Sequence, residues 1–176
     1  DDGREIEASR IVIATGSSPF VPDQYARLGD RVLTNENLFD LDDLPARLAV
    51  VGSGSIGLEL AQAMARLGVE VSLFDQGQRL GGIRCDKVHD ALRAIIAADL
   101  TLHLGVEIEA GASEDGVTLT WRGASSGQGE FDRVLVATGR PPNLASLDLA
   151  ASGLDLDDDG VPAHDRATMR CGDSTI

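Results

Sequence analysis

The chain has 176 residues, of which 43% are hydrophobic, and its 29 acidic residues against 15 Lys and Arg give a formal charge of −14. This length suits one domain or slightly more, and the negative charge argues against nucleic acid and anionic membranes as partners. No apolar run reaches the roughly 20 residues of a membrane-spanning helix. The two cysteines, Cys85 and Cys171, form no disulfide framework, so we expect a reducing cytoplasmic environment. Since only 3% of residues are aromatic, the core must be aliphatic, as in a parallel sheet covered by helices.

The first 46 residues predict little regular structure. Residues 4–7 alternate polar and apolar side chains and residues 10–14 are almost continuously apolar, so each segment is expected to form a strand. Small residues and a proline at 15–19 then end the second strand. Residues 20–46 contain further prolines and an acidic run, and we interpret them as an irregular linker.

A strand–helix–strand unit is expected next. Residues 48–51 form a short buried strand, and residues 56–67 carry apolar side chains at the spacing of one helix face. Gly68 is expected to end this helix, because glycine readily adopts the left-handed conformation that follows a helix. Residues 69–74 alternate as a second strand, and the whole segment has the size of a βαβ unit.

The following segment predicts a helix and then several strands. The helix is expected over residues 86–98. Four strand-like segments follow it, at 100–104, 106–110, 117–121 and 130–137. Turns at 113–116 and 123–129 would make the middle strands a small antiparallel meander, after which the chain returns to the parallel sheet. The predicted fold class is therefore α/β, a Rossmann-like three-layer dinucleotide-binding domain with a parallel sheet and a small antiparallel meander.

One motif in the strand–helix–strand unit points to chemistry. Residues 52–57, between the first strand and the helix, have the pattern G-x-G-x-x-G. Gly52 would allow the tight turn out of the strand, Gly54 would let a pyrophosphate approach the backbone, and Gly57 would let the helix pack against the strand. The first helical turn, with Ser55 and Ile56, would offer free N–H groups and a partial positive charge to the phosphates.

An acidic residue completes this pattern. Asp75 lies at the end of the second strand, where dinucleotide-binding domains place the acid that accepts hydrogen bonds from the adenosine ribose. The motif, its position and the acid together predict NAD(H) as ligand. The alternative is a glycine-rich turn that binds nothing.

Further motifs resemble a known family. Residues 11–16 and 134–139 each form a hydrophobic strand that ends in Ala-Thr-Gly. Residues 52–59 read G-x-G-x-I-G-x-E, and residues 137–143 read A-T-G-R-x-P-N. With these four segments in this order, the chain resembles the FAD-dependent pyridine nucleotide–disulfide oxidoreductases, and within that family it is similar to the dihydrolipoyl dehydrogenases over nearly its whole length.

The resemblance implies a domain organisation. In that family the NAD-binding domain is inserted into the FAD domain, so residues 1–45 would be a remnant of the FAD domain with a linker. Residues 46–140 would be the NAD(H)-binding domain, and residues 141–176 the return segment toward the FAD domain. The family's flavin-binding glycine motif, redox-active cysteine pair and catalytic histidine would lie outside the chain. We therefore expect the chain alone to bind NAD(H) without FAD and to be inactive.

The resemblance also implies functions for the complete protein and for single residues. A homodimer would pass electrons from a dithiol through a cysteine pair and FAD to NAD, with a 2-oxo acid dehydrogenase complex as a possible partner. Glu59 would approach the nicotinamide carboxamide, although a glutamate near a helix N-terminus is also favourable by itself. Ser55 takes the place of a tyrosine that covers the flavin in many relatives. Val106 would contact the adenine, and the backbone of Gly139 the nicotinamide.

Several alternatives stay open. The complete protein could instead be an NADH oxidase, another flavoprotein reductase that does not act on disulfides, or a non-catalytic dinucleotide sensor. Arg79 and Arg84 follow Asp75 and are the residue type with which NADP-binding relatives hold the 2′-phosphate. Cys85 and Cys171 lack the spacing of a redox pair or a metal site, and we interpret both as structural or incidental thiols. The three histidines have no partner spacing and are interpreted as core or surface residues.

Overall fold

The structure, a computed structural model, describes residues 5–176. The chain divides into two compact units. The first is Pro19–Arg140, called here the core unit, and the second, called the flanking unit, combines the residues up to Ser18 with Pro141–Ile176. No helix among residues 5–176 is long and apolar enough to cross a membrane.

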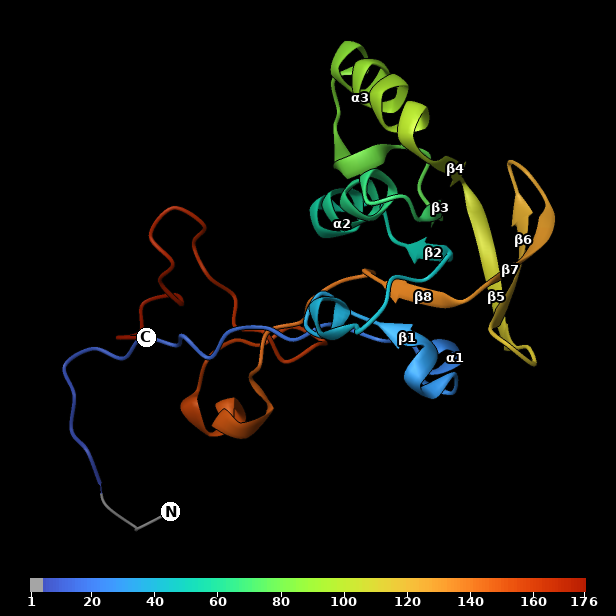
Figure 1. The fold of residues 1–176 in the computed structure, drawn as a ribbon. Helices are drawn as coiled ribbons and strands as arrows, with labels where there is room; N and C mark the ends of the chain where they lie inside the picture. Colours follow the sequence, from blue (N-terminus) through green and yellow to red (C-terminus); the bar gives the residue numbers. More distant parts are fainter. Residues whose placement is uncertain (1–4) are drawn as a thin grey trace. The chain divides into compact units, whose positions relative to one another are not determined.

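A five-stranded parallel sheet forms the centre of the core unit (Figure 1). Its strands, in spatial order, are β1 (Val32–Leu33), β8 (Arg133–Val136), β2 (Arg47–Val51), β3 (Glu70–Asp75) and β4 (Thr101–Leu104). Three further strands form an antiparallel sheet, namely β5 (Val106–Ala112), β6 (Val117–Gly123) and β7 (Gly127–Phe131). The helices are α1 (Asp23–Ala26), α2 (Ser55–Arg66) and α3 (Asp86–Asp99), with short 3-10 turns at Gly29–Arg31, Leu38–Asp40 and Leu80–Gly82.

The alternation of side chains along the parallel strands produces three layers. On β2, Leu48 and Val50 face a cluster that includes residues of α2 and α3, whereas Ala49 and Val51 face a cluster that includes residues of α1 and the antiparallel sheet. All four side chains are buried, as expected for a parallel strand covered on both faces. The helices α2 and α3 therefore cover one face of the parallel sheet, and the antiparallel sheet covers the other (Figure 1).

The fold class predicted from the sequence is confirmed. The helix of the βαβ unit ends at Arg66, and Gly68 follows with a φ of 96°, in the left-handed region that glycine was expected to supply. The chain leaves the parallel sheet after β4, forms the antiparallel meander and returns as β8 between β1 and β2. The expected last strand was wrong in its extent. The expected strand 130–137 is two strands, because the chain passes from the meander to the parallel sheet at Asp132.

The expected turn at 123–129 is also too long, since β7 begins at Gly127. A glycine-rich strand gives little periodic signal, because glycine has no side chain to alternate. In the structure the reason for the glycine is visible. A Cβ at Gly127 would lie 2.6 Å from the indole ring of Trp121, which crosses over this position from β6.

The predicted linker 20–46 is wrong as well, because most of it is part of the core unit. It contains α1 and β1, and β1 pairs in parallel with β8 at the edge of the sheet. Tyr25, Leu28, Leu33 and Leu38 from this segment are buried in the two hydrophobic clusters. The compact core unit of the structure begins at Pro19.

The flanking unit has little regular structure. The expected strands at 4–7 and 10–14 are absent from the described residues 5–14, and Arg4 lies outside them. A strand requires neighbouring strands for its backbone groups, whereas residues 10–14 show one inter-residue backbone hydrogen bond, from Ile11 N–H to the carbonyl of Thr175. Two isolated bridges, Ser17 with Pro142 and Leu156 with Pro162, and 3-10 turns at Ala145–Leu147 and Leu149–Ser152 complete the unit.

Candidate functional site

A cavity of about 440 Å³ opens at the carboxyl edge of the parallel sheet in the core unit. It lies where β2, β3 and β8 end, and its lining residues are Pro22, Gln24, Tyr25, Val51, Gly52, Ser53, Gly54, Asp75, Gln76, Ile108, Ala137, Thr138 and Gly139. From β2 the chain proceeds through β3 to β4 on one side, while β8 and β1 lie on the other. Open α/β sheets bind their ligands at such a reversal of strand order.

Two of the three motif glycines are required by the fold itself. A Cβ at Gly52 would lie 2.3 Å from the carbonyl oxygen of Ala137, and its φ of 105° is unfavourable for any other residue. A Cβ at Gly57 would lie 1.9 Å from the carbonyl oxygen of Gly52. These two glycines therefore allow the β2–α2 turn to pack closely against the end of β8.

Gly54 differs from both. Its φ of −67° is accessible to other residues, and a Cβ there would meet no atom within 4 Å. Gly54 lines the cavity, so the space beside it is the open space of the cavity. The fold leaves this space free but does not need a glycine there.

The first turn of α2 follows directly on Gly54. The helix begins at Ser55 without a side-chain cap, and its first intrahelical backbone bond runs from Leu58 N–H to the carbonyl of Gly54. The N–H groups of the first turn therefore have no acceptor within the helix. Together with the helix dipole they favour an anionic group at this position.

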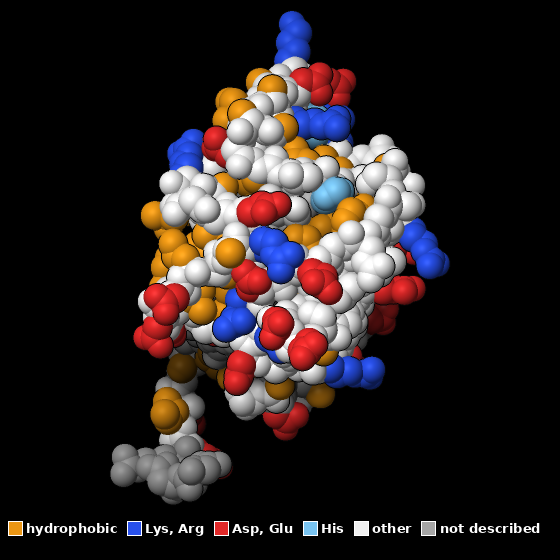
Figure 2. All heavy atoms as spheres, turned by 45° about the vertical axis from the view of Figure 1, so that its right-hand side comes forward, with side chains coloured by type: hydrophobic (Ala, Val, Ile, Leu, Met, Phe, Trp, Pro, Cys, Tyr) orange, Lys and Arg blue, Asp and Glu red, His pale blue; other side chains and the backbone are white. Residues whose placement is uncertain are grey.

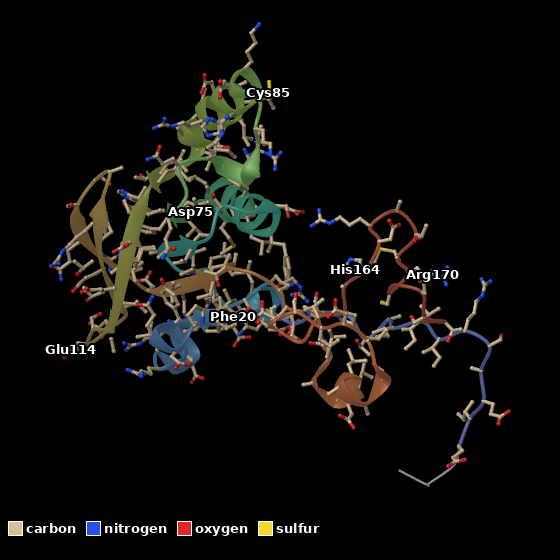
Figure 3. The ribbon with its side chains drawn as sticks, turned by 180° about the vertical axis from the view of Figure 1, so that it is seen from behind. Phe20, Asp75, Cys85, Glu114, His164 and Arg170 are labelled. Carbon is tan, nitrogen blue, oxygen red and sulfur yellow. The ribbon has the colours of Figure 1, made fainter. Side chains whose placement is uncertain are left out.

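Asp75 lies at the end of β3, near the start of α2 (Figure 3). One carboxylate oxygen accepts a hydrogen bond from Ser53 N–H at 2.5 Å, and the other accepts one from Gly77 N–H at 2.6 Å. These two contacts fix the carboxylate against the glycine-rich turn at the cavity wall. A carboxylate has about four lone-pair positions, so each oxygen can still accept a hydrogen bond from a ligand.

The neighbouring arginine Arg79 is held by its own loop. Its guanidinium donates to the carbonyls of Ile83 and Arg84, at 2.8 and 3.2 Å, and pairs with Asp86 at 2.9 Å. These contacts occupy the guanidinium within its own loop. Neither Arg79 nor Arg84 lines the cavity.

The structure places the predicted site residues in three groups. Gly52, Gly54, Asp75 and Gly139 line the cavity. Ser55, Ile56 and Gly57 form the first turn of α2 beside it, and Glu59 is exposed one turn further along the helix. Val106 stands apart, because it is only 1% exposed and belongs to the hydrophobic cluster under the meander. On the same strand, Ile108 is the residue that reaches the cavity.

Sequence reasoning missed the part of the lining that comes from α1. Pro22, Gln24 and Tyr25 lie in the segment interpreted as a linker. Phe20 fixes the start of this segment to the exit of β8. Its N–H donates to the carbonyl of Gly139 at 3.0 Å, and its carbonyl accepts from the Thr138 hydroxyl at 3.1 Å. The Ala-Thr-Gly motif already marked Thr138 in the sequence. The helix α1 has only four residues after a proline, which is too short to show a helical period.

The histidines and cysteines do not line this cavity. The imidazole of His103 stacks on Phe74 at 4.7 Å, and desolvation by burial lowers its pKa below the ordinary value. Cys85 and Cys171 are free, and Cys85 stands at the start of α3 (Figure 3). Residues 5–176 contain no cluster of His, Cys, Asp or Glu that could hold a metal ion. The face drawn in Figure 2 carries acidic and basic side chains interspersed.

A comparison with protein families decides where the chain belongs. The profile of the pyridine nucleotide-disulphide oxidoreductase family matches residues 1–173. The chain belongs to this family. It is 35% identical over 158 residues to a mercuric reductase of Lysinibacillus sphaericus, covering 88% of the chain and 29% of that protein. It is 33% identical over 171 residues to dihydrolipoyl dehydrogenase of Bacillus subtilis, covering 93% of the chain and 36% of that protein.

Solved structures agree with this assignment. The HOCl-induced flavoprotein disulfide reductase of Escherichia coli superposes with a TM-score of 0.76 at 25% identity, covering 89% of the chain and 36% of that protein. An NADH-bound water-forming NADH oxidase of Lactobacillus brevis superposes with a TM-score of 0.69 at 25% identity, covering 87% and 35%. The chain thus spans about a third of the length of the relatives it matches.

Proposed function

We propose that the core unit binds NAD(H) in its cavity. In the complete protein it would orient the nicotinamide for hydride transfer with FAD, as part of a dihydrolipoyl dehydrogenase-like disulfide oxidoreductase. The observation that carries the proposal is the contrast among the three motif glycines. Gly52 and Gly57 are required by packing, whereas Gly54 borders the open space of the cavity. A pyrophosphate is the group that uses both this space and the free N–H groups of α2.

The lining of the cavity fits the two ends of the dinucleotide. Asp75 would accept hydrogen bonds from the ribose of the adenosine half, since its carboxylate is already held at the cavity wall. The exit of β8, with Gly139 at a φ of 154° and no atom within 4 Å of its Cβ position, leaves room for the nicotinamide half. Ile108 takes the place on β5 for which Val106 was predicted, and Glu59 stays a predicted contact for the complete protein. The bound cofactor supplies the hydride, while this chain supplies binding and orientation.

We also propose NADH rather than NADPH as the preferred cofactor. A carboxylate beside the adenosine ribose would repel a 2′-phosphate. Arg79, the nearest candidate for binding that phosphate, is engaged by its own loop. The L. brevis oxidase offers a parallel, because its NADPH-bound engineered form carries five substitutions that remove an aspartate and add two arginines.

The reaction of the complete protein is a wider proposal. Oxidation of a dithiol through FAD to NAD, in a homodimer that could serve a 2-oxo acid dehydrogenase complex, follows the dihydrolipoyl dehydrogenase relative. An NADH oxidase is the second candidate, favoured by the NADH-bound oxidase among the structural relatives. Both candidates share the cavity and its proposed ligand, so the binding experiment applies to each.

Replacing Gly54 by valine tests the site directly. The added side chain would occupy the proposed place of the pyrophosphate, so we expect NADH binding to be lost, with a dissociation constant raised at least about 100-fold by steric exclusion, or about 2.7 kcal/mol. The fold should persist, because the position borders open space. Titration of NADH into the 176-residue chain by fluorescence or calorimetry measures the change, and circular dichroism checks the fold. An unchanged NADH affinity in a folded Gly54→Val chain would show that Gly54 is only a turn residue.

A further inference from the structure

Tyr25, which lines the cavity, is a buried tyrosine. It is the only tyrosine of the chain, it is 2% exposed, and its ring belongs to the cluster that contains Val51 and Val136. Its backbone is fixed on both sides, since Tyr25 N–H donates to the carbonyl of Pro22 at 2.9 Å and Leu28 N–H donates to the carbonyl of Tyr25 at 2.8 Å. The ring is therefore held in one place at the end of the parallel sheet.

The hydroxyl of Tyr25 has no partner among residues 5–176. The only fully covered side-chain polar atom without a partner in that part of the chain is Nε2 of His89. The Tyr25 oxygen thus keeps some accessible surface, and the space that Tyr25 lines is the cavity. Burial raises the pKa of this hydroxyl to about 12, so the group is protonated at neutral pH and can donate a hydrogen bond.

The position of α1 indicates which half of the dinucleotide lies beside Tyr25. Asp75, at the end of β3, marks the adenosine side of the cavity. On the other side of β2 lies β8, and the segment that leads into α1 is tied to its exit by the two hydrogen bonds between Phe20 and the pair Thr138 and Gly139. After α1 the chain forms β1, which pairs with β8. Tyr25 therefore belongs to the β8 side of the cavity.

The Tyr25 hydroxyl keeps accessible surface but has no protein partner within the described part of the chain, so in the free protein only water can accept its hydrogen bond. A ligand oxygen would supply the missing acceptor. We propose that the Tyr25 hydroxyl donates a hydrogen bond to an oxygen of the nicotinamide ribose or its phosphate in the bound dinucleotide. This assignment rests on the proposed NAD(H) site. It adds a residue of α1 to the proposed contacts from the glycine motif and from the end of β3.

The test compares NADH with ADP, which lacks the nicotinamide half, in the wild-type chain and in Tyr25→Phe. We expect the dissociation constant for NADH to rise about 2- to 12-fold in the variant, as for the loss of one hydrogen bond, and the constant for ADP to stay unchanged. The melting temperature of the free variant should be equal or higher, because no protein contact is lost. Thr120→Val, which removes a hydroxyl on β6 outside the cavity lining, is the matched control and should change neither constant.

Selective labelling gives a second readout, because tyrosine-labelled chain contains one labelled ring. NADH should shift the resonances of this ring, and ADP should shift them much less. An unchanged NADH affinity in Tyr25→Phe, an equal loss for NADH and ADP, or a lower melting temperature would each overturn the assignment. If the wild-type chain binds ADP and NADH equally well, the adenosine site stands and the Tyr25 contact falls. If it binds neither, the proposed function itself fails.

Discussion

The two units of the chain differ in how their backbones are paired, although both contain strongly apolar segments. In the core unit the apolar residues of β2 lie between β8 and β3 and are buried on both faces. In the flanking unit Ile11 and Val12 are 51% and 85% exposed, and their segment forms no strand. The contrast shows that an apolar run becomes a strand only where neighbouring strands supply hydrogen bonds and a layer covers the side chains.

The largest effect should come from removing a core side chain at the centre of the sheet. Leu73 on β3 is fully buried, so Leu73→Ala should lower the free energy of unfolding by about 2–5 kcal/mol through lost burial and a residual cavity. The matched change in the flanking unit, Val12→Ala, should stay within about 0.5 kcal/mol, as for exposed positions. Urea unfolding followed by far-UV circular dichroism compares the two. Similar losses in both variants would mean that the flanking segment is packed as tightly as the core.

A smaller effect separates glycines that the fold requires from the one that it does not. Gly57→Ala should destabilise the core unit by about 1–3 kcal/mol, because the added Cβ collides with the carbonyl of Gly52. Gly54→Ala should leave stability unchanged or slightly raised, since a Cβ there meets nothing and alanine restricts the unfolded chain. Thermal unfolding of the two variants decides the point. Equal melting temperatures would contradict the packing argument for Gly57.

The smallest expected effect is a pH dependence that belongs to the core unit. Burial lowers the pKa of His103 in the folded chain below its ordinary value of 6.5, so the unfolded state binds a proton more readily. The contribution of His103 to stability is therefore complete above about pH 6.5 and decreases as the pH falls from there toward the lowered pKa of the folded state.

Replacing His103 tests this dependence. His103→Phe, which keeps an aromatic ring against Phe74, should flatten the stability profile below pH 6.5. His164→Gln in the flanking unit is the control and should leave the slope of the core transition unchanged. Urea unfolding at several pH values, followed by the fluorescence of Trp121 in the core unit, provides the measurement. An identical slope in His103→Phe and wild type would assign the dependence to other groups.

Much of the core unit could be predicted from sequence because its signals are local. The periodicity of residues 56–67 and the left-handed Gly68 defined α2, and the alternation of residues 69–74 defined β3. The strand β1 could not be found in this way, since two residues carry no period and its pairing with β8 joins segments far apart in the chain. β7 was missed because its glycines accommodate Trp121 rather than form a pattern.

The candidate site also contains residues that local sequence signals predict and residues that only the packing brings there. Gly52, Gly54 and Asp75 were predictable because the β2–α2–β3 unit brings a contiguous motif to one edge of the sheet. Tyr25 and Ile108 enter the cavity from elements on the opposite face of the sheet, so only the three-dimensional packing brings them there. Val106, which the resemblance implied as an adenine contact, is buried, and Ile108 on the same strand lines the cavity.

The preference of the chain for NADH over NADPH tests the proposed site most directly, since it depends on the position of one carboxylate. With Asp75 beside the adenosine ribose, a 2′-phosphate should weaken binding by about 1–3 kcal/mol, which is about a 5- to 150-fold higher dissociation constant for NADPH. Asp75→Asn, which removes the charge, should bring the two constants closer together. Both reduced cofactors are titrated into the wild-type chain and the variant at one ionic strength. A dissociation constant for NADPH equal to or below that for NADH in the wild-type chain would contradict the assignment of Asp75.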